Sequence, residues 1–406
     1  MKGDRIMDQK RVVEQTENQG LASLVGLVNL IRQQKARERL SYLRHCKSSS
    51  FQELRQMEQS ITQVIESNRG GAKGVHGFIG ERAQVGISNA RSLMDGNVPQ
   101  YRLIDDNGMT DYFRGKLPIQ QKACISDKTL GLTHVKAHCN NYPEYISEQN
   151  GIYQIPRDFY VTYKRFKDMP ASEAGKLLKA DWRLWKRVQA FQEECPDCVI
   201  EPMVVDYADI QANAIGQTIG RERLALERVY RKRRAVAVKK GKASLREGAR
   251  IVACSAAIEG LVDGGLSVIE HLQEGKSFSE LDRDDWCEIG VDALQGVSKG
   301  AVRGGAVYAM TNLAGIPAPI AGASVSVAFV TIEATAKYVN GDLDGVECAE
   351  TIAEGCLNAA VCAAFAKLGD RIIKVPILGS LVGGAVGMLA CELIKFFVMR
   401  PKPQAA

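Results

Sequence analysis

The sequence predicts an α+β protein in which a small α/β core is preceded by a helical hairpin and followed by a Gly/Ala-rich all-α bundle. Three observations support this prediction. Apolar residues recur at helical spacing over residues 8–68, alternate with a period of two between residues 101 and 125, and then return to helical spacing. Twenty of the 38 glycines lie in the last 160 residues, mostly within apolar helical patterns. A chain of 406 residues is long enough for two or three domains.

Residues 1–70 are expected to form a helical hairpin arm. The first helix is predicted to run to about Cys46. The second begins at Ser50, because Glu53 three residues later completes a capping-box signal. The second helix carries one apolar stripe, which consists of Leu54, Met57, Ile61, Val64 and Ile65. An intramolecular hairpin and a coiled-coil-like dimerisation arm both fit this pattern.

Residues 71–160 are expected to form the α/β core. A helix from about Val75 to Met94 precedes three short antiparallel strands joined by Asp106-Asn107-Gly108 and Gly115-Lys116 turns. These strands are predicted at Tyr101–Asp105, Met109–Arg114 and Leu117–Ile125. A helix near residues 127–148 and a strand at Ile152–Ile155 complete the unit.

Residues 161–246 are expected to form a basic helical connector, with Trp182, Trp185 and Phe191 as packing anchors. Residues 221–250 contain twelve Lys or Arg against three Glu, so this stretch holds more than the whole net charge of +6. It can be a solvated linker, a contact for nucleic-acid phosphates or a contact for an anionic membrane surface. The candidate contact residues are Arg231, Lys232, Arg233, Arg234, Lys239, Lys240 and Lys242.

Residues 247–406 are expected to form the helical bundle, in weak repeats of about 60 residues that each close on a glutamate (Glu270, Glu333 and Glu392). Glycines recur at four-residue spacing at 296, 300 and 304 and at 379, 383 and 387, which lets helix backbones approach closely. The segments Leu313–Val339 and Val375–Val398 approach membrane length. Charged residues on other helices favour a bundle that is soluble or that meets a membrane when triggered.

The eleven cysteines follow no regular framework, which argues for a reducing compartment. The polar N-terminus has no apolar segment of a secretory signal. We therefore expect a cytoplasmic protein, with association with the inner membrane left open. Cys195 and Cys198 form a lone CxxC with no second pair nearby in the sequence, so a zinc site is not favoured.

One constellation in the core points to chemistry. Alternation places Gln120 and Lys122 on one face of a strand, and a tight turn brings Asp111 opposite them. The preceding helix supplies Glu81. Two carboxylates can hold Mg²⁺, or Mn²⁺ in its place, and a lysine can orient a water or stabilise a phosphodiester transition state. His134 and His138, at helical spacing, fit core or surface histidines or an auxiliary phosphate contact.

The order Glu81, Asp111, Gln120-x-Lys122 resembles the restriction-endonuclease-like superfamily of PD-(D/E)xK nucleases. The local sequence is similar to a branch found in bacterial toxin and defence-type proteins, whose members often join this core to Gly-rich apolar helices. The resemblance implies a restriction-endonuclease-like fold for residues 74–160, with Glu81, Asp111, Gln120 and Lys122 as catalytic residues and Glu81 and Asp111 as metal ligands.

Gln120 departs from the family pattern, since it stands where the second acid is usual and offers a neutral oxygen. The resemblance therefore implies either a metal-dependent nuclease-like effector in bacterial defence or conflict, or a non-enzymatic membrane-active or scaffolding protein with a degenerate nuclease fold. The expected partners are nucleic acid, a membrane surface and further copies of the chain.

Overall fold

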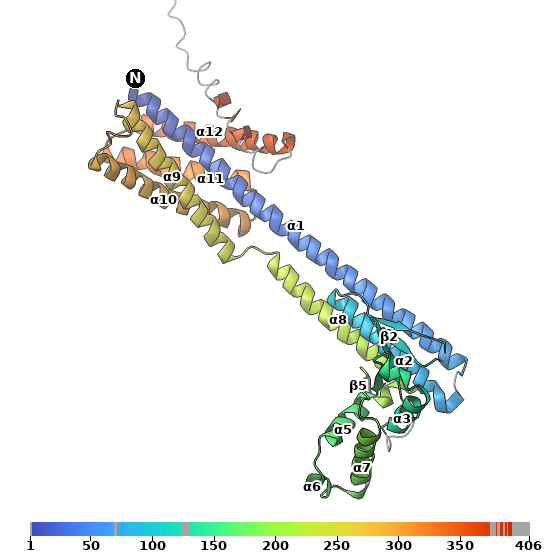
Figure 1. Cartoon of the computed structure of the whole chain (residues 1–406). Coiled ribbons are helices and arrows are strands. Elements are labelled where there is room, and N and C mark those ends of the chain that lie inside the picture. Colours follow the sequence, from blue (N-terminus) through green and yellow to red (C-terminus); the bar gives the residue numbers. More distant parts are fainter. Residues whose placement is uncertain are drawn as a thin grey trace, which may run out of the picture. The chain divides into compact units, whose positions relative to one another are not determined.

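The computed structural model describes residues 2–68, 71–106, 108–123 and 130–373, with short stretches between 379 and 391. For residues 2–18, 72–73 and 370 the backbone alone is described. The chain divides into two compact units, one made of residues 37–239 and the other of residues 1–36 with 240–406. We call them the central unit and the terminal unit (Figure 1).

The described residues are mostly helical, which with one mixed sheet agrees with the predicted α+β class. The helices of the central unit, with α1 shared by both units, are α1 (Lys2–Glu66), α2 (Gly71–Asp95), α3 (Leu132–Asn141), α4 (Glu144–Ser147), α5 (Arg157–Lys167), α6 (Ala171–Ala174), α7 (Lys179–Glu194), the 3₁₀ helix η1 (Tyr207–Ile210) and α8 (Ile215–Lys240). The strands are β1 (Tyr101–Leu103), β2 (Tyr112–Arg114), β3 (Leu117–Gln121), β4 (Ile152–Ile155) and β5 (Ile200–Pro202). The terminal unit adds α9 (Leu245–Gln273), α10 (Arg283–Asn312), α11 (Ala318–Asn340) and α12 (Gly345–Ile372).

The predicted helical hairpin in residues 1–70 is wrong, because α1 continues as one helix from Lys2 to Glu66. Ser50 does not cap a second helix. Its hydroxyl donates a 2.7 Å hydrogen bond to the carbonyl of Ala90 on α2, and the Glu53 carboxylate accepts one from the amide of Asn89. Tertiary contacts with α2 thus use the two polar groups that resembled a capping box.

The sheet has the strand order β1-β2-β3-β4-β5, with β1, β2 and β3 antiparallel and β3, β4 and β5 parallel. The three antiparallel strands and β4 confirm the predicted elements, although the strands are shorter than expected. The predicted helix near 127–148 is divided into α3 and α4. The sheet also extends past residue 160, where the core was expected to end, because β5 pairs with β4.

Helices cover both faces of the sheet. The α2 side is lined by Tyr112, Ile119 and Ile152, which pack with Val85 of α2. On the other face Tyr153 and Ile155 of β4 belong to a cluster with residues of α3, α5 and α7. Of the predicted packing anchors, Phe191 is buried and Trp185 is partly buried, whereas Trp182 is 36% exposed.

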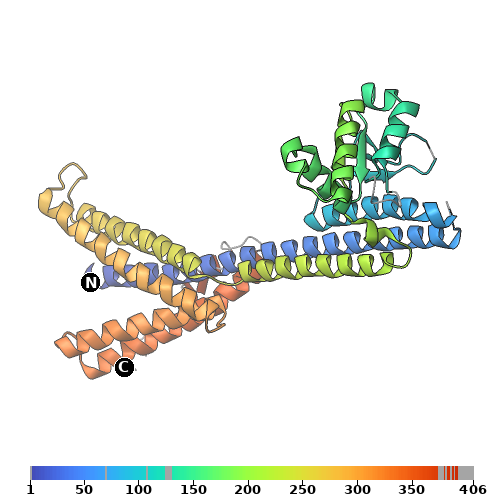
Figure 2. The same ribbon diagram turned by 90° about the horizontal axis from the view of Figure 1, so that it is seen from below.

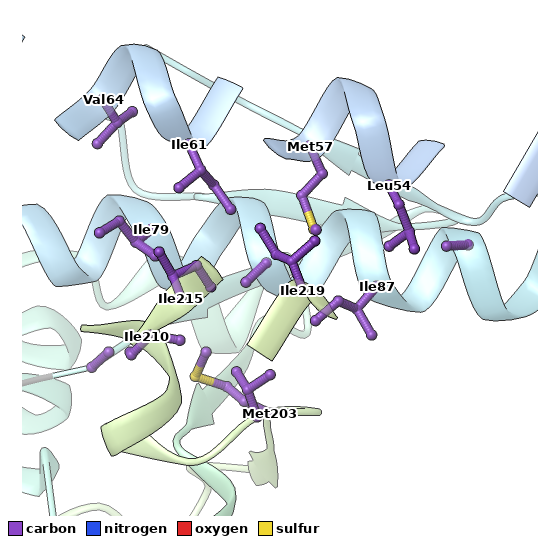
Figure 3. Packing of buried hydrophobic residues seen from close by; sticks show 14 of the residues in the cluster. Leu54, Met57, Ile61, Val64, Ile79, Ile87, Met203, Ile210, Ile215 and Ile219 are labelled. Atoms are coloured by element: carbon purple, nitrogen blue, oxygen red, sulfur yellow. The ribbon is translucent and has the colours of Figure 1, made fainter. Parts of the chain in front are cut away.

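A second core of the central unit lies between α1, α2 and α8 (Figures 2 and 3). Leu54, Met57 and Ile61 of α1 face Ile87 of α2 and Ile219 of α8. The predicted apolar stripe of residues 54–65 therefore packs against other helices of the same chain. Gly86 of α2 lies against Met57, and an added Cβ would come within 2.5 Å of that side chain.

The terminal unit is built on close contact between α9 and α10, which lie side by side in Figures 1 and 2. A Cβ added at Gly296 or Gly300 would lie 2.5 Å from a backbone carbonyl oxygen of α9, at Glu259 and Ser255 respectively. The predicted use of this glycine series for helix packing is confirmed. In the second series, Gly383 and Gly387 lie against α12 in the same way.

Three helical stretches of the described residues are long and apolar enough to cross a membrane, by length and composition: Ile215–Gln273, Ala318–Asn340 and Gly345–Gly369. The second coincides with the predicted Leu313–Val339 and starts after Pro317. The other predicted segment, Val375–Val398, lies largely outside the described residues, as does the predicted repeat marker Glu392.

Candidate functional site

The β2–β3 hairpin brings Asp111 and Gln120 side by side. Its two-residue turn begins at Gly115, whose φ of 63° suits glycine, and this turn pairs Tyr112 with Ile119. One residue beyond that pair, the N–H of Asp111 donates to the carbonyl of Ile119 at 3.0 Å. The predicted juxtaposition of Asp111 with the Gln120 position is therefore present.

Two hydrogen bonds fix the Asp111 carboxylate through a single oxygen. Its Oδ2 accepts from the amide Nε2 of Gln120 at 2.8 Å and from the backbone N–H of Gln121 at 2.6 Å. Burial raises the pKa of this carboxyl to about 6, while the Gln121 N–H and the Lys122 ammonium oppose that rise. Asp111 therefore releases its proton close to neutral pH.

Gln120 presents an unused acceptor at the same place. Its side chain is 5% exposed, and its Oε1 has no hydrogen-bond partner among the described residues. The amide nitrogen must face Asp111, because a carboxylate only accepts hydrogen bonds, so the carbonyl oxygen points elsewhere. A buried orphan oxygen beside a carboxylate is a suitable second donor for a hard cation.

Lys122 follows directly after β3 and is partly buried. Its backbone N–H donates to the carbonyl of Gln154 at 2.8 Å, which fixes its place next to β4. Its positive charge, together with burial, lowers the pKa of His138 to about 4, with burial the larger cause. His138 is therefore neutral at pH 7. It lies buried near the hairpin, with Nδ1 2.8 Å from the Tyr153 hydroxyl, whereas His134 is exposed.

Glu81 lies on α2 and approaches the sheet from that side. Its Oε2 is 3.9 Å from Nη1 of Arg82, which also binds Asp105. Gln121 contacts α2 through the carbonyl of Gly77, so strand alternation turns Gln120 toward the other face. Both carboxylates, Asp111 and Glu81, contribute to raising the pKa of Tyr112, although burial is the main cause. The structure thus brings Asp111, Gln120 and Lys122 together and leaves Glu81 on α2, which covers the opposite face of the sheet.

Asp111→Asn is expected to stabilise the protein at high pH in the absence of added divalent metal. A folded-state pKa of about 6, above the ordinary 3.8, means that stability falls as pH rises through 4 to 6. Asparagine keeps the acceptor oxygen without the charge, so the variant should gain about 1–2 kcal/mol at pH 8 and almost nothing at pH 4. Urea unfolding, followed by the fluorescence of Trp182 and Trp185, measures the difference. A gain that is equal at both pH values contradicts the prediction.

The basic residues of α8 fall into two groups. Arg231 pairs with Glu227 at 3.2 Å within α8, whereas Arg233 binds the carbonyl of Met94 and the Asp95 carboxylate and so links α8 to α2. The other five candidate contact residues are exposed: Lys232, Arg234, Lys239, Lys240 and Lys242. The helix α8 ends at Lys240, and α9 begins at Leu245.

One cluster of three cysteines has no signal in the sequence. Cys139 joins Cys195 and Cys198, and the three sulfur atoms lie within 4.8 Å of one another. Cys139 is far from the CxxC pair in the sequence, and a single cysteine on a helix carries no signal of its own.

Comparisons with family models, with curated proteins and with solved structures give no match for this chain.

Proposed function

We propose that the chain is a metal-dependent nuclease-like effector of the restriction-endonuclease-like superfamily, which hydrolyses phosphodiester bonds in DNA or RNA. The observation that carries this proposal is the contact of Asp111 with Gln120, next to Lys122, on one face of the β2–β3 hairpin. The element order of residues 71–155, helix, three antiparallel strands, helix and parallel strand, supports it. Bacterial defence or conflict is the context that the resemblance suggests.

The described residues suit Mg²⁺ or Mn²⁺. Oδ2 of Asp111 is occupied by two hydrogen bonds, so Oδ1 is the oxygen left for a cation, and Gln120 Oε1 is the neighbouring donor. Glu81 is not part of this donor set, because it lies on α2, which covers the opposite face of the sheet. When bound, the metal would neutralise phosphate charge and lower the pKa of an attacking water.

The chain's own groups then have distinct tasks. The Gln121 N–H and the Gln120 amide hold the Asp111 carboxylate in one orientation. The Lys122 ammonium stabilises the negative charge that develops on the phosphate oxygens, or orients the water that attacks. The exposed lysines and arginines at the end of α8 supply phosphate contacts that are independent of sequence.

The test is cleavage of single-stranded DNA, duplex DNA and RNA by the full chain, with Mg²⁺ and with Mn²⁺. Asp111→Asn and Lys122→Ala should each lower the cleavage rate by about 100-fold or more, as expected when a metal ligand or a charge-stabilising group is lost. Lys116→Ala is the matched control, because Lys116 is an exposed lysine in the turn of the same hairpin. It should retain full activity.

The second candidate function is that of a non-enzymatic membrane-active or scaffolding protein. The three helical stretches of membrane length and the glycine-mediated packing of α9 on α10 favour assembly or membrane contact by the terminal unit. If the wild-type chain cleaves none of the substrates with either metal, this non-enzymatic function becomes the better supported one. Cleavage that persists unchanged in both variants would instead show that Asp111 and Lys122 do not carry the reaction.

A further inference from the structure

Three cysteines from two separate parts of the chain meet in the central unit. Cys139 is near the end of α3, Cys195 terminates α7, and Cys198 precedes β5. The N–H of Cys198 donates to the carbonyl of Cys195 at 3.2 Å, which forms a tight turn around Pro196. This turn presents both of its thiols to Cys139, whose Sγ lies 3.0 Å from that of Cys198.

The spacing of the sulfur atoms fits a shared ion. A disulfide has an S–S distance of about 2.05 Å, and three thiols cannot all be paired with one another. Thiolates bound tetrahedrally to zinc at about 2.3 Å lie about 3.8 Å apart. The three sulfur atoms here are separated by at most 4.8 Å, so small side-chain rotations would place all three on one ion.

The surroundings of the cluster are those of a supported site. The Tyr153 hydroxyl lies 3.3 Å from Cys139 Sγ and 2.8 Å from Nδ1 of His138, so a buried polar chain fixes the orientation around that sulfur. All three cysteines pack against the apolar cluster formed by α3, α5, α7 and β4. Lys136 and Glu194 form a 2.6 Å ion pair between α3 and α7, so both helices are held close to the cluster.

We propose that Cys139, Cys195 and Cys198 bind one Zn²⁺ ion, with the fourth position left to a water molecule. Thiolates prefer zinc to Mg²⁺, and a short CxxC turn with a third cysteine from a neighbouring helix is a suitable donor set. The ion would tie α3, α7 and β5 together, which secures the edge of the sheet. This proposal is independent of the nuclease activity, because it uses none of Asp111, Gln120 and Lys122.

Metal analysis of the tag-free full chain, purified without chelator, tests the proposal. We expect about one zinc per chain in the wild type and close to none in Cys139→Ser and Cys198→Ser. Cys287→Ser is the matched control, since Cys287 is exposed and lies in the terminal unit, and it should keep its zinc. Lys122→Ala should also keep zinc, which separates this result from a failure of the nuclease assay.

If the cysteine variants fail to fold, reconstitution of the metal-free wild-type chain with Co²⁺ and Zn²⁺ tests the same proposal. After removal of the metal by a chelator, Co²⁺ should produce thiolate-to-cobalt charge-transfer absorption, and Zn²⁺ should abolish it. Iron in place of zinc, a Cys139–Cys198 disulfide in the native protein, or three thiols that titrate freely in metal-free wild type would each overturn the proposal.

Discussion

Glu259→Ala is expected to destabilise the terminal unit by about 3–5 kcal/mol, because it leaves a buried guanidinium without its carboxylate. Glu259 of α9 is 1% exposed and Arg303 of α10 is 3% exposed, and their Oε2 and Nη1 atoms are 3.0 Å apart. Arg303 also lies over the ring of Phe329 on α11, 4.5 Å from its centroid. The guanidinium therefore joins three helices. Thermal unfolding of the full chain, followed by circular dichroism, measures the loss.

Two comparisons isolate the cause. The double variant Glu259→Met/Arg303→Met removes both charges and keeps the volume, so it should recover most of the stability lost in Glu259→Ala. Glu333→Ala removes one member of an exposed pair with Lys337 and should cost less than about 0.5 kcal/mol. A loss of under about 1 kcal/mol in Glu259→Ala would show that the pair contributes little.

Gly300→Ala and Gly290→Ala, the same substitution on the same helix, should have opposite effects. A Cβ at Gly300 would lie 2.5 Å from the carbonyl oxygen of Ser255 and 2.9 Å from the Cα of Ala256, so α9 and α10 must separate. The expected cost is about 2–3 kcal/mol. Gly290 has open space around its Cβ position, and alanine there should add about 0.5–1 kcal/mol of stability, since glycine weakens a helix interior.

The same unfolding experiment measures both variants. Equal changes in the midpoint of unfolding would mean that helix propensity alone determines the effect of both substitutions. The close approach of α9 and α10 would then not limit the stability of the terminal unit. A larger side chain, as in Gly300→Leu, should increase the loss further, whereas Gly290→Leu should remain close to the alanine variant.

The hairpin that carries the candidate site could be predicted because its information is local. Strand alternation and a two-residue turn at Gly115 suffice to place Asp111 opposite Gln120, and both are visible over a dozen residues of sequence. The glycine series at 296, 300 and 304 was likewise readable, because a spacing of four marks one face of a helix. Local periodicity thus gave the elements and the contacts within one hairpin.

The features that the sequence did not reveal depend on distant contacts. The three-residue β5 contains a proline and is specified by pairing with β4. Ser50 lies inside α1, and its hydroxyl donates to Ala90 of α2 instead of capping a new helix. The Glu259–Arg303 pair and the Cys139–Cys198 contact join residues 44 and 59 positions apart, and no pattern in the sequence links their members.

The single helix α1 has a consequence for biosynthesis. Its first 36 residues belong to the unit that also contains residues 240–406, and Ala22 and Val25 pack with Ile251 and Val307. Residues 37–239, by contrast, form a compact unit from one continuous segment of the chain. On the ribosome the central unit can therefore fold before Ala22 and Val25 of the N-terminal segment have residues to pack against. Residues 1–36 can pack in the terminal unit only after residues beyond 240, and so more than half of the chain, have been translated.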